Sequence, residues 1–100
     1  DIGWTDIGSW ATLLEVLEAD KAGNVVRGPM EAVMLDTKNS LIYTSKRLVT
    51  TIGVEDLIIV DTEDALLVCP RDRAEGVRQI VDWLKQSGLS DYLVDFTPKE

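Results

Sequence analysis

The first ten residues of the chain hold the side chains best suited to chemistry. The segment Asp1–Trp10 contains two acidic residues, two glycines and two tryptophans. Asp6 offers a hard carboxylate oxygen of the kind that magnesium prefers, Gly8 lets backbone approach a ligand closely, and Trp4 supplies rigid apolar surface. The pattern indicates either one wall of a binding pocket or a loop that enters a helix with both tryptophans buried. These residues alone leave both interpretations open.

The charge and the hydrophobicity of the chain exclude several classes of partner. Ten basic and eighteen acidic residues give a formal net charge of −8. This charge argues against a surface for nucleic acid or for an anionic membrane, because both require a basic footprint. The longest apolar runs are far too short to span a bilayer. We therefore expect no nucleic-acid partner and no membrane partner.

The chain has one cysteine, Cys69, and no histidine. A disulfide within the chain is therefore excluded, and so are a cysteine–histidine catalytic pair and a Cys/His zinc site. One cysteine at the end of an apolar run is typical of a small core residue and fits a reducing cytoplasm. We expect a cytoplasmic protein and no catalytic residue within these 100 residues.

Two stretches have the apolar spacing of amphipathic helices. Ser9 is a candidate N-cap for a helix over residues 9–20, which the segment Ala22–Asn24 ends. A second helix begins near Asp72, with Glu75 as the reciprocal partner of a capping box, and Gly88 ends it. Its predicted buried stripe is Val77, Ile80, Val81 and Leu84, and the apolar tail that we expect to dock on the core carries Tyr92, Leu93, Val94 and Phe96.

Short β-rich runs fill the middle of the chain. They lie at residues 33–35, 41–43, 48–52, 57–60 and 65–69. Their starts recur every seven to nine residues, which is typical of stacked or meandering β structure. The loops between them are too short for crossover helices, so a βαβ sheet is excluded. An antiparallel meander and a solenoid both remain, and the continuously apolar runs predict a sheet that is covered on both faces.

Several motifs resemble one enzyme family. The segment Gly3–Trp10 reads GWTDIGSW and resembles W-[ST]-D-[VI]-G-S-W, the signature that closes the catalytic domain of mannose-1-phosphate guanylyltransferases. Other segments resemble the same family in the same order, namely Gly23–Val26, Leu35–Tyr43, Ile52–Thr62, Ala65–Val68 and Arg71–Arg73. Each motif is weak alone, but the order and spacing of the set are specific.

The resemblance implies a fold. We expect a mainly β chain with flanking helices: a short, irregular, left-handed β-helix-like module, preceded by one helix and followed by a C-terminal helix. Residues 1–22 would end the nucleotidyltransferase catalytic domain, and residues 23–100 would form the β-helix-like C-terminal module with its terminal helix and tail. The glycine-rich nucleotide loop of the family is not among these 100 residues, so we expect the fragment alone to be inactive.

The resemblance also implies a function. The chain would be the C-terminal part of an enzyme that makes GDP-mannose and pyrophosphate from GTP and α-D-mannose 1-phosphate. Asp6 matches the aspartate that holds Mg²⁺ together with a second aspartate from the preceding domain. Trp4 and Gly8 would shape the sugar-phosphate pocket.

The resemblance implies several partners as well. They are GTP, mannose 1-phosphate, the chain's own N-terminal catalytic domain and further copies in a homo-oligomer. Two alternatives stay open: a non-catalytic oligomerisation or interaction module, and a nucleotidyltransferase for a different sugar 1-phosphate.

Overall fold

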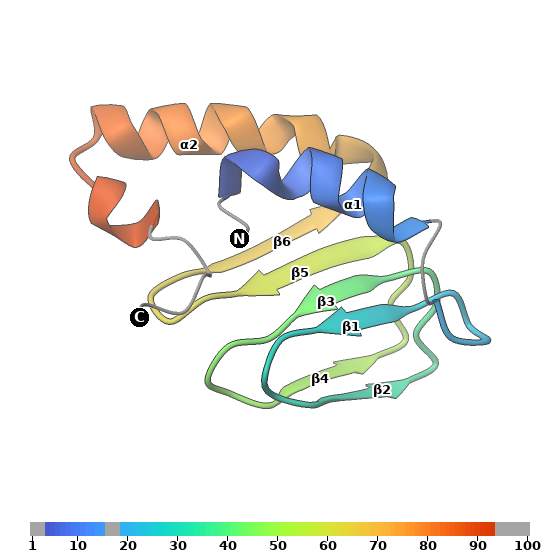
Figure 1. Ribbon diagram of the computed structural model, residues 1–100. Helices are drawn as coiled ribbons and strands as arrows, with labels where there is room; N and C mark the ends of the chain where they lie inside the picture. Colours follow the sequence, from blue (N-terminus) through green and yellow to red (C-terminus); the bar gives the residue numbers. More distant parts are fainter. Residues whose placement is uncertain (1–3, 16–18, 94–100) are drawn as a thin grey trace.

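The computed structural model describes residues 4–15 and 19–93, and it builds three layers from short strands and helices (Figure 1). The elements in chain order are η1 (Trp4–Asp6), α1 (Ile7–Glu15), β1 (Val25–Arg27), β2 (Ala32–Leu35), β3 (Leu41–Tyr43), β4 (Val49–Ile52), β5 (Leu57–Asp61), β6 (Leu66–Pro70), η2 (Arg71–Gly76), α2 (Val77–Gln86) and η3 (Ser90–Leu93). The α elements are α-helices, and the η elements are short 3₁₀ helices.

The strands are arranged as stacked coils. Each coil places one strand in a four-stranded sheet of order β1-β3-β5-β6, the large sheet, and β2 and β4 form a two-stranded small sheet. The pairs β1–β3, β3–β5 and β2–β4 are all parallel. Paired residues lie 16 or 17 positions apart, as in Val25 opposite Leu41 and Ala32 opposite Val49. The β-helix-like module is therefore confirmed, and the antiparallel meander is wrong.

The stack ends with a reversal of the chain. β6 pairs antiparallel with β5, so that Ile59 lies opposite Val68. The turn between them is closed by Thr62, whose backbone N–H donates to the Ala65 carbonyl at 2.9 Å and whose hydroxyl oxygen accepts from the Ala65 N–H at 3.1 Å. β6 is consequently the outermost strand of the large sheet.

Apart from the edge strand β6, whose Leu66 and Val68 are exposed, the large sheet is covered on both faces, as its continuously apolar strands predict. In Figure 1 the helices lie side by side on one face and the small sheet lies on the other. The helical face packs in one hydrophobic core, whose buried members are Trp4, Ile7, Trp10, Val25, Leu41, Ile58, Val60, Leu67, Val77 and Val81. On the opposite face, Ile42 and Ile59 are also buried, because successive side chains of a strand alternate between faces.

The corners between strands repeat along the stack. Asn39 and Asp56 both have positive φ angles, of 52° and 58°, and Gly23 has 82° at the equivalent corner of the preceding coil. Asp36 and Gly53 form a second such set, with φ of 51° and 65°. The left-handed region is open to glycine and tolerated by asparagine and aspartate. The turn residues therefore allow the chain to fold back at the same place in each coil.

The first helix starts earlier than its sequence predicts. α1 begins at Ile7, so Ser9 lies inside the helix and is not its N-cap. Trp4, Ile7 and Trp10 are spaced by three residues and all are buried, and their packing extends helical backbone toward the N-terminus. Residues 19 and 20 are not helical, because the Asp20 carboxylate accepts backbone N–H groups from Ala22 and Asn24, each at 2.9 Å.

The predicted start of the second helix is wrong, and its predicted end is confirmed. The capping box of Asp72 and Glu75 does not form, because residues Arg71–Gly76 make a 3₁₀ helix and α2 starts only at Val77. Gly88 does end the helix, with φ of 76°. The Leu89 N–H donates to the Leu84 carbonyl at 2.8 Å, which is the Schellman pattern.

The predicted buried faces of the second helix and the tail are only partly observed. Within the helical stripe Val77 and Val81 are buried, whereas Ile80 is 46% exposed. In the tail Leu93 packs against the core and Tyr92 is 46% exposed. Val94 and Phe96 lie outside the described residues.

We predict that Gly28→Ala destabilises the fold more than Gly53→Ala. A Cβ at Gly28 (φ 108°) would overlap the Thr44 carbonyl oxygen of the next coil, whereas a Cβ at Gly53 (φ 65°) meets nothing within 4 Å. Gly53→Ala should cost about 1–2 kcal/mol for left-handed backbone, and Gly28→Ala at least about 1 kcal/mol more, because backbone must move. Urea unfolding of both variants measures the difference, and equal losses would contradict the stacking of Gly28 against Thr44.

Candidate functional site

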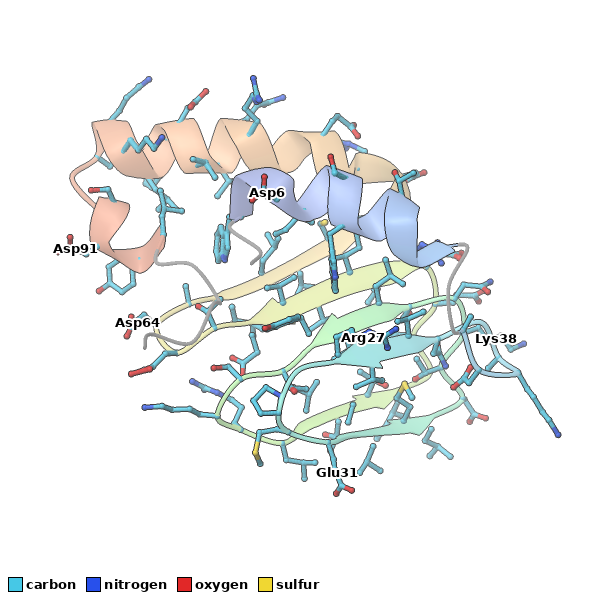
Figure 2. The ribbon with its side chains drawn as sticks, viewed as in Figure 1. Asp6, Arg27, Glu31, Lys38, Asp64 and Asp91 are labelled. Carbon is cyan, nitrogen blue, oxygen red and sulfur yellow. The ribbon has the colours of Figure 1, made fainter. Side chains whose placement is uncertain are left out.

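Asp6 lies where η1 runs directly into α1. Figure 2 shows it on the side of the helix that faces away from the strands, and its side chain is exposed. Two nearby residues have the opposite environment, because Trp4 is 6% exposed and Ile7 is fully buried. The two buried residues fix the backbone on either side of Asp6, so the carboxylate is presented to solvent from a firmly held segment.

Gly8 is also exposed, in the first turn of α1. A Cβ built there would meet nothing within 4 Å, so a molecule outside the chain could approach this backbone closely. Thr12, one turn later, donates its hydroxyl hydrogen to the Gly8 carbonyl at 3.1 Å and is exposed as well. Gly8 and Thr12 therefore share one exposed side of the first helical segment, and Asp6 is exposed two residues before Gly8.

Trp4 occupies a different environment from Asp6 and Gly8. Its indole ring is buried in the core, and its Nε1 has no hydrogen-bond partner among the described residues. Trp10 is buried too and packs edge-on against Tyr43, with ring centroids 6.0 Å apart. The structure thus leaves Asp6 and Gly8 exposed and places Trp4 in the core. The ligand contacts predicted for these three residues stay predictions.

The acidic side chains are spread over the surface. Figure 2 shows Asp6, Glu31, Asp64 and Asp91 at separate places. Among the described residues, no group of three histidine, cysteine, aspartate or glutamate side chains is close enough to hold a metal ion. Asp6 could therefore supply one ligand to a metal whose other ligands come from elsewhere.

Asp61 is a buried carboxylate that reasoning from the sequence does not single out. It is 1% exposed at the end of β5, and the Nε atom of Arg47 lies 3.3 Å from its Oδ2. The geometry of that contact is not a hydrogen bond, so the attraction is one of charge. The signal in the sequence is an aspartate directly after an entirely apolar strand.

Cys69 lies on β6 and packs against the core. Burial raises the pKa of its thiol, and the carboxylate of Glu75 raises that pKa further. A raised pKa keeps the sulfur protonated, and the thiol is a poor nucleophile. The environment agrees with the predicted role of a small core residue.

A groove runs along the outer edge of β6, beneath α2. It has a volume of about 630 Å³. Its walls include Leu66 and Val68 on β6, Ile80 and Leu84 on α2, and Tyr92 on η3, with Trp4 also in the lining. Sequence reasoning assigns Ile80 and Leu84 to a buried helical stripe. Leu84 does pack against the core, whereas Ile80 remains 46% exposed at the groove.

A comparison with protein families identifies the fold family. The family model described as the MannoseP isomerase/GMP-like beta-helix domain matches residues 30–84, more than half of the chain. The chain belongs to this family. The match spans β2 to β6 and most of α2. The resemblance drawn from the sequence motifs is confirmed.

Several curated proteins are similar in sequence to this β-helix domain. A mannose-1-phosphate guanylyltransferase of Escherichia coli is 46% identical over 92% of this chain and 19% of its own length. Xanthan biosynthesis protein XanB of Xanthomonas campestris pv. campestris is 43% identical over 91% of this chain and 19% of its own. Alginate biosynthesis protein AlgA of Pseudomonas putida is 38% identical over 89% of this chain and 18% of its own length. The chain spans about a fifth of the length of these relatives.

One solved structure shares the arrangement of this β-helix domain. It is a crystal structure described as a mannose-1-phosphate geranyltransferase from Thermus thermophilus, with a TM-score of 0.69 and 37% sequence identity. The similarity covers 76% of this chain and 23% of the other. Within residues 4–15 and 19–93, no helix is long and apolar enough to cross a membrane.

We predict that Arg47→Ala destabilises the fold more than Lys46→Ala. Lys46 forms the shorter ion pair, 3.0 Å from Glu63, but both partners are mostly exposed, so its loss should cost about 0–0.5 kcal/mol. Removing Arg47 deprives the buried Asp61 carboxylate of its countercharge and should cost about 1–3 kcal/mol, since Arg47 itself is largely exposed. Thermal unfolding of the two variants tests this order, and a larger loss for Lys46→Ala would show that pair distance outweighs burial.

We predict that the Cys69 thiol reacts slowly with iodoacetamide in the folded protein. At pH 8 its rate should be at least about fivefold below that of a free cysteine peptide, because less of the thiol is ionised. Glu75→Gln should raise the rate only slightly, since burial is the larger cause of the raised pKa. Alkylation in urea provides the control, and a folded-state rate equal to the rate in urea would contradict the prediction.

Proposed function

We propose that this chain is part of a mannose-1-phosphate guanylyltransferase, which joins GTP and α-D-mannose 1-phosphate into GDP-mannose and pyrophosphate. The observation that carries the proposal is the 46% identity to the Escherichia coli enzyme of that name over 92% of the chain. The order of the motifs from Gly3 to Arg73 supports it. The single cysteine supports a place in the cytoplasm.

In this proposal Asp6 holds the magnesium ion of the reaction. An exposed carboxylate at the start of a helix fits that ion, because magnesium takes oxygen ligands and usually binds one or two carboxylates, with phosphates and waters as its other ligands. The second carboxylate would come from the preceding catalytic domain. A bound magnesium ion supplies positive charge where the phosphate oxygens of GTP and of the sugar phosphate come together.

The other residues of this segment have supporting roles. Trp4 and Ile7 anchor the backbone on both sides of Asp6 in the core, so the packing of the core sets the position of Asp6. Gly8 leaves open space beside the helix backbone, and this space would let a sugar phosphate approach. Trp4 would act mainly by packing in the core and fixing η1. A direct contact between Trp4 and the sugar phosphate would require its buried indole ring to become accessible.

A specific observation also favours the interaction-module alternative. The outer face of the small sheet exposes Val33, Leu35 and Ile52 by 56%, 58% and 73%. The register places Leu35 directly opposite Ile52, so these side chains form a continuous apolar surface. Exposed apolar surface of this kind marks contact sites. We propose that this face makes contacts with the catalytic domain or with another copy in a homo-oligomer, alongside the enzymatic role.

We predict that Asp6→Asn in the full-length protein lowers guanylyltransferase activity by about 100-fold or more, a size typical of removing a group that stabilises transition-state charge. The assay contains GTP, mannose 1-phosphate and magnesium, and it follows the release of pyrophosphate. Asp64→Asn is the matched control, because Asp64 is an exposed acid far from Asp6 (Figure 2). Its activity should equal that of the wild type.

Each result of this assay separates the candidate functions. An active wild type with an active Asp6→Asn variant would keep the enzyme and remove the metal role of Asp6. A wild type without activity on mannose 1-phosphate, but with activity on another sugar 1-phosphate, would change the substrate. A wild type without activity on any sugar 1-phosphate would favour the interaction module.

A further inference from the structure

The edge of β6 is an open hydrogen-bonding surface. Among the described strands β6 has a single neighbour, β5, so the backbone groups on its other side have no partner strand. Such an edge is a template for the addition of a further strand. This strand also lines the open groove beneath α2.

The walls of this groove are apolar and incompletely covered. Leu66 and Val68 on β6 are 61% and 53% exposed on the sheet face away from the helices, because Val68 pairs with Ile59. On the helical side of the same edge, Ile80 and Tyr92 are each 46% exposed. A line of backbone donors and acceptors flanked by apolar walls is the arrangement that takes up an extended peptide, because the backbone gives affinity and alternate side chains fill the walls. The groove therefore fits an extended segment with apolar side chains.

Trp4 provides a second, independent indication of an occupant. Its indole is 6% exposed, lines the groove, and has no hydrogen-bond partner for Nε1 within the described part of the chain. A buried N–H donor without an acceptor is unfavourable and is rare in folded proteins. An extended segment in the groove would bring carbonyl oxygens to this donor.

We propose that the groove binds an extended segment of the same polypeptide, from the catalytic domain that precedes these 100 residues in the full-length protein, and that this segment adds to β6 as a further strand. The inference rests on the proposed function, in which such a domain exists. The relatives extend far beyond the matched region, which is 19% of the Escherichia coli enzyme. Trp4, in the first described element, lies at the groove, so the preceding polypeptide is tethered beside its binding site at high effective concentration.

We test the proposal by hydrogen–deuterium exchange of the full-length protein over a roughly hundredfold range of concentration, where free edge amides exchange early. We predict that the β6 amides exchange as slowly as those of the central strand β3 at every concentration. Fast exchange at β6 would overturn the proposal. Protection that is lost on dilution would also overturn it, because the occupant would then be a second copy of the chain.

A pair of variants on α2 locates the protection. Ile80→Arg places a charge in the groove, whereas Trp83→Arg changes a residue that is 60% exposed on the same helix and does not line the groove. Exchange at β6 should rise by at least roughly tenfold in Ile80→Arg through local opening, and it should not change in Trp83→Arg. An unchanged rate in Ile80→Arg, or equal acceleration in both variants, would overturn the proposal.

The exchange measurement does not depend on activity. Concentration-independent protection in a protein without guanylyltransferase activity would support the groove and refute the proposed function. An active enzyme whose β6 amides are unprotected would support the proposed function and refute the groove proposal. If Ile80→Arg does not fold, exchange of the wild-type β6 amides over the concentration range still tests the proposal.

Discussion

The amide side chain of Asn24 is buried where two coils meet, and it fixes how the coils stack. Its Nδ2 donates to the Thr37 carbonyl at 2.8 Å, and its Oδ1 accepts from the Ser40 N–H at 2.9 Å. One coil further, the Ser40 hydroxyl oxygen accepts from the Leu57 N–H at 3.3 Å. Each buried group has a partner only in this register, and a slip by one residue would leave several unpaired at about 1–3 kcal/mol each. The same slip would turn every strand side chain to the wrong face.

The opposite corner of the stack applies the same constraint with Thr44. Its N–H donates to the Arg27 carbonyl at 2.8 Å, its hydroxyl donates to the Met30 carbonyl at 2.8 Å, and the absence of a side chain at Gly28 makes room for it. With both corners fixed, the large sheet presents a flat apolar face to the helices. That face buries Trp4 and Ile7 and so determines where Asp6 emerges. The position of the candidate metal ligand therefore follows from the register of the coils.

The sequence predicts the local features of the fold better than it predicts which strands pair and in which direction. The strand starts and the covered sheet follow from apolar runs between turn residues, and Gly88 follows from the need for positive φ at the helix end. The direction of pairing does not follow, because a strand such as β3 finds its partners 16 or 17 residues away and short loops permit either a meander or a coil. Ser9 and the pair Asp72–Glu75 have good capping chemistry, but burial of Trp4 and the 3₁₀ turn after Pro70 determine the helix starts.

The candidate site could be predicted only in part, because a motif gives residue types and not their exposure. The type of residue at position 6 follows from the motif, but its exposure follows from the packing of Trp4 and Ile7 into the core. Trp4 points inward with an unpartnered donor, and Asp6, two residues later, is exposed. A segment in the groove that accepts a hydrogen bond from Trp4 Nε1 would hold η1 on its buried side. Asp6 would bind its ligands on the exposed side. If the proposed segment binds in the groove, its contact with Trp4 would also help to position Asp6, because both residues belong to the same three-residue 3₁₀ helix, η1.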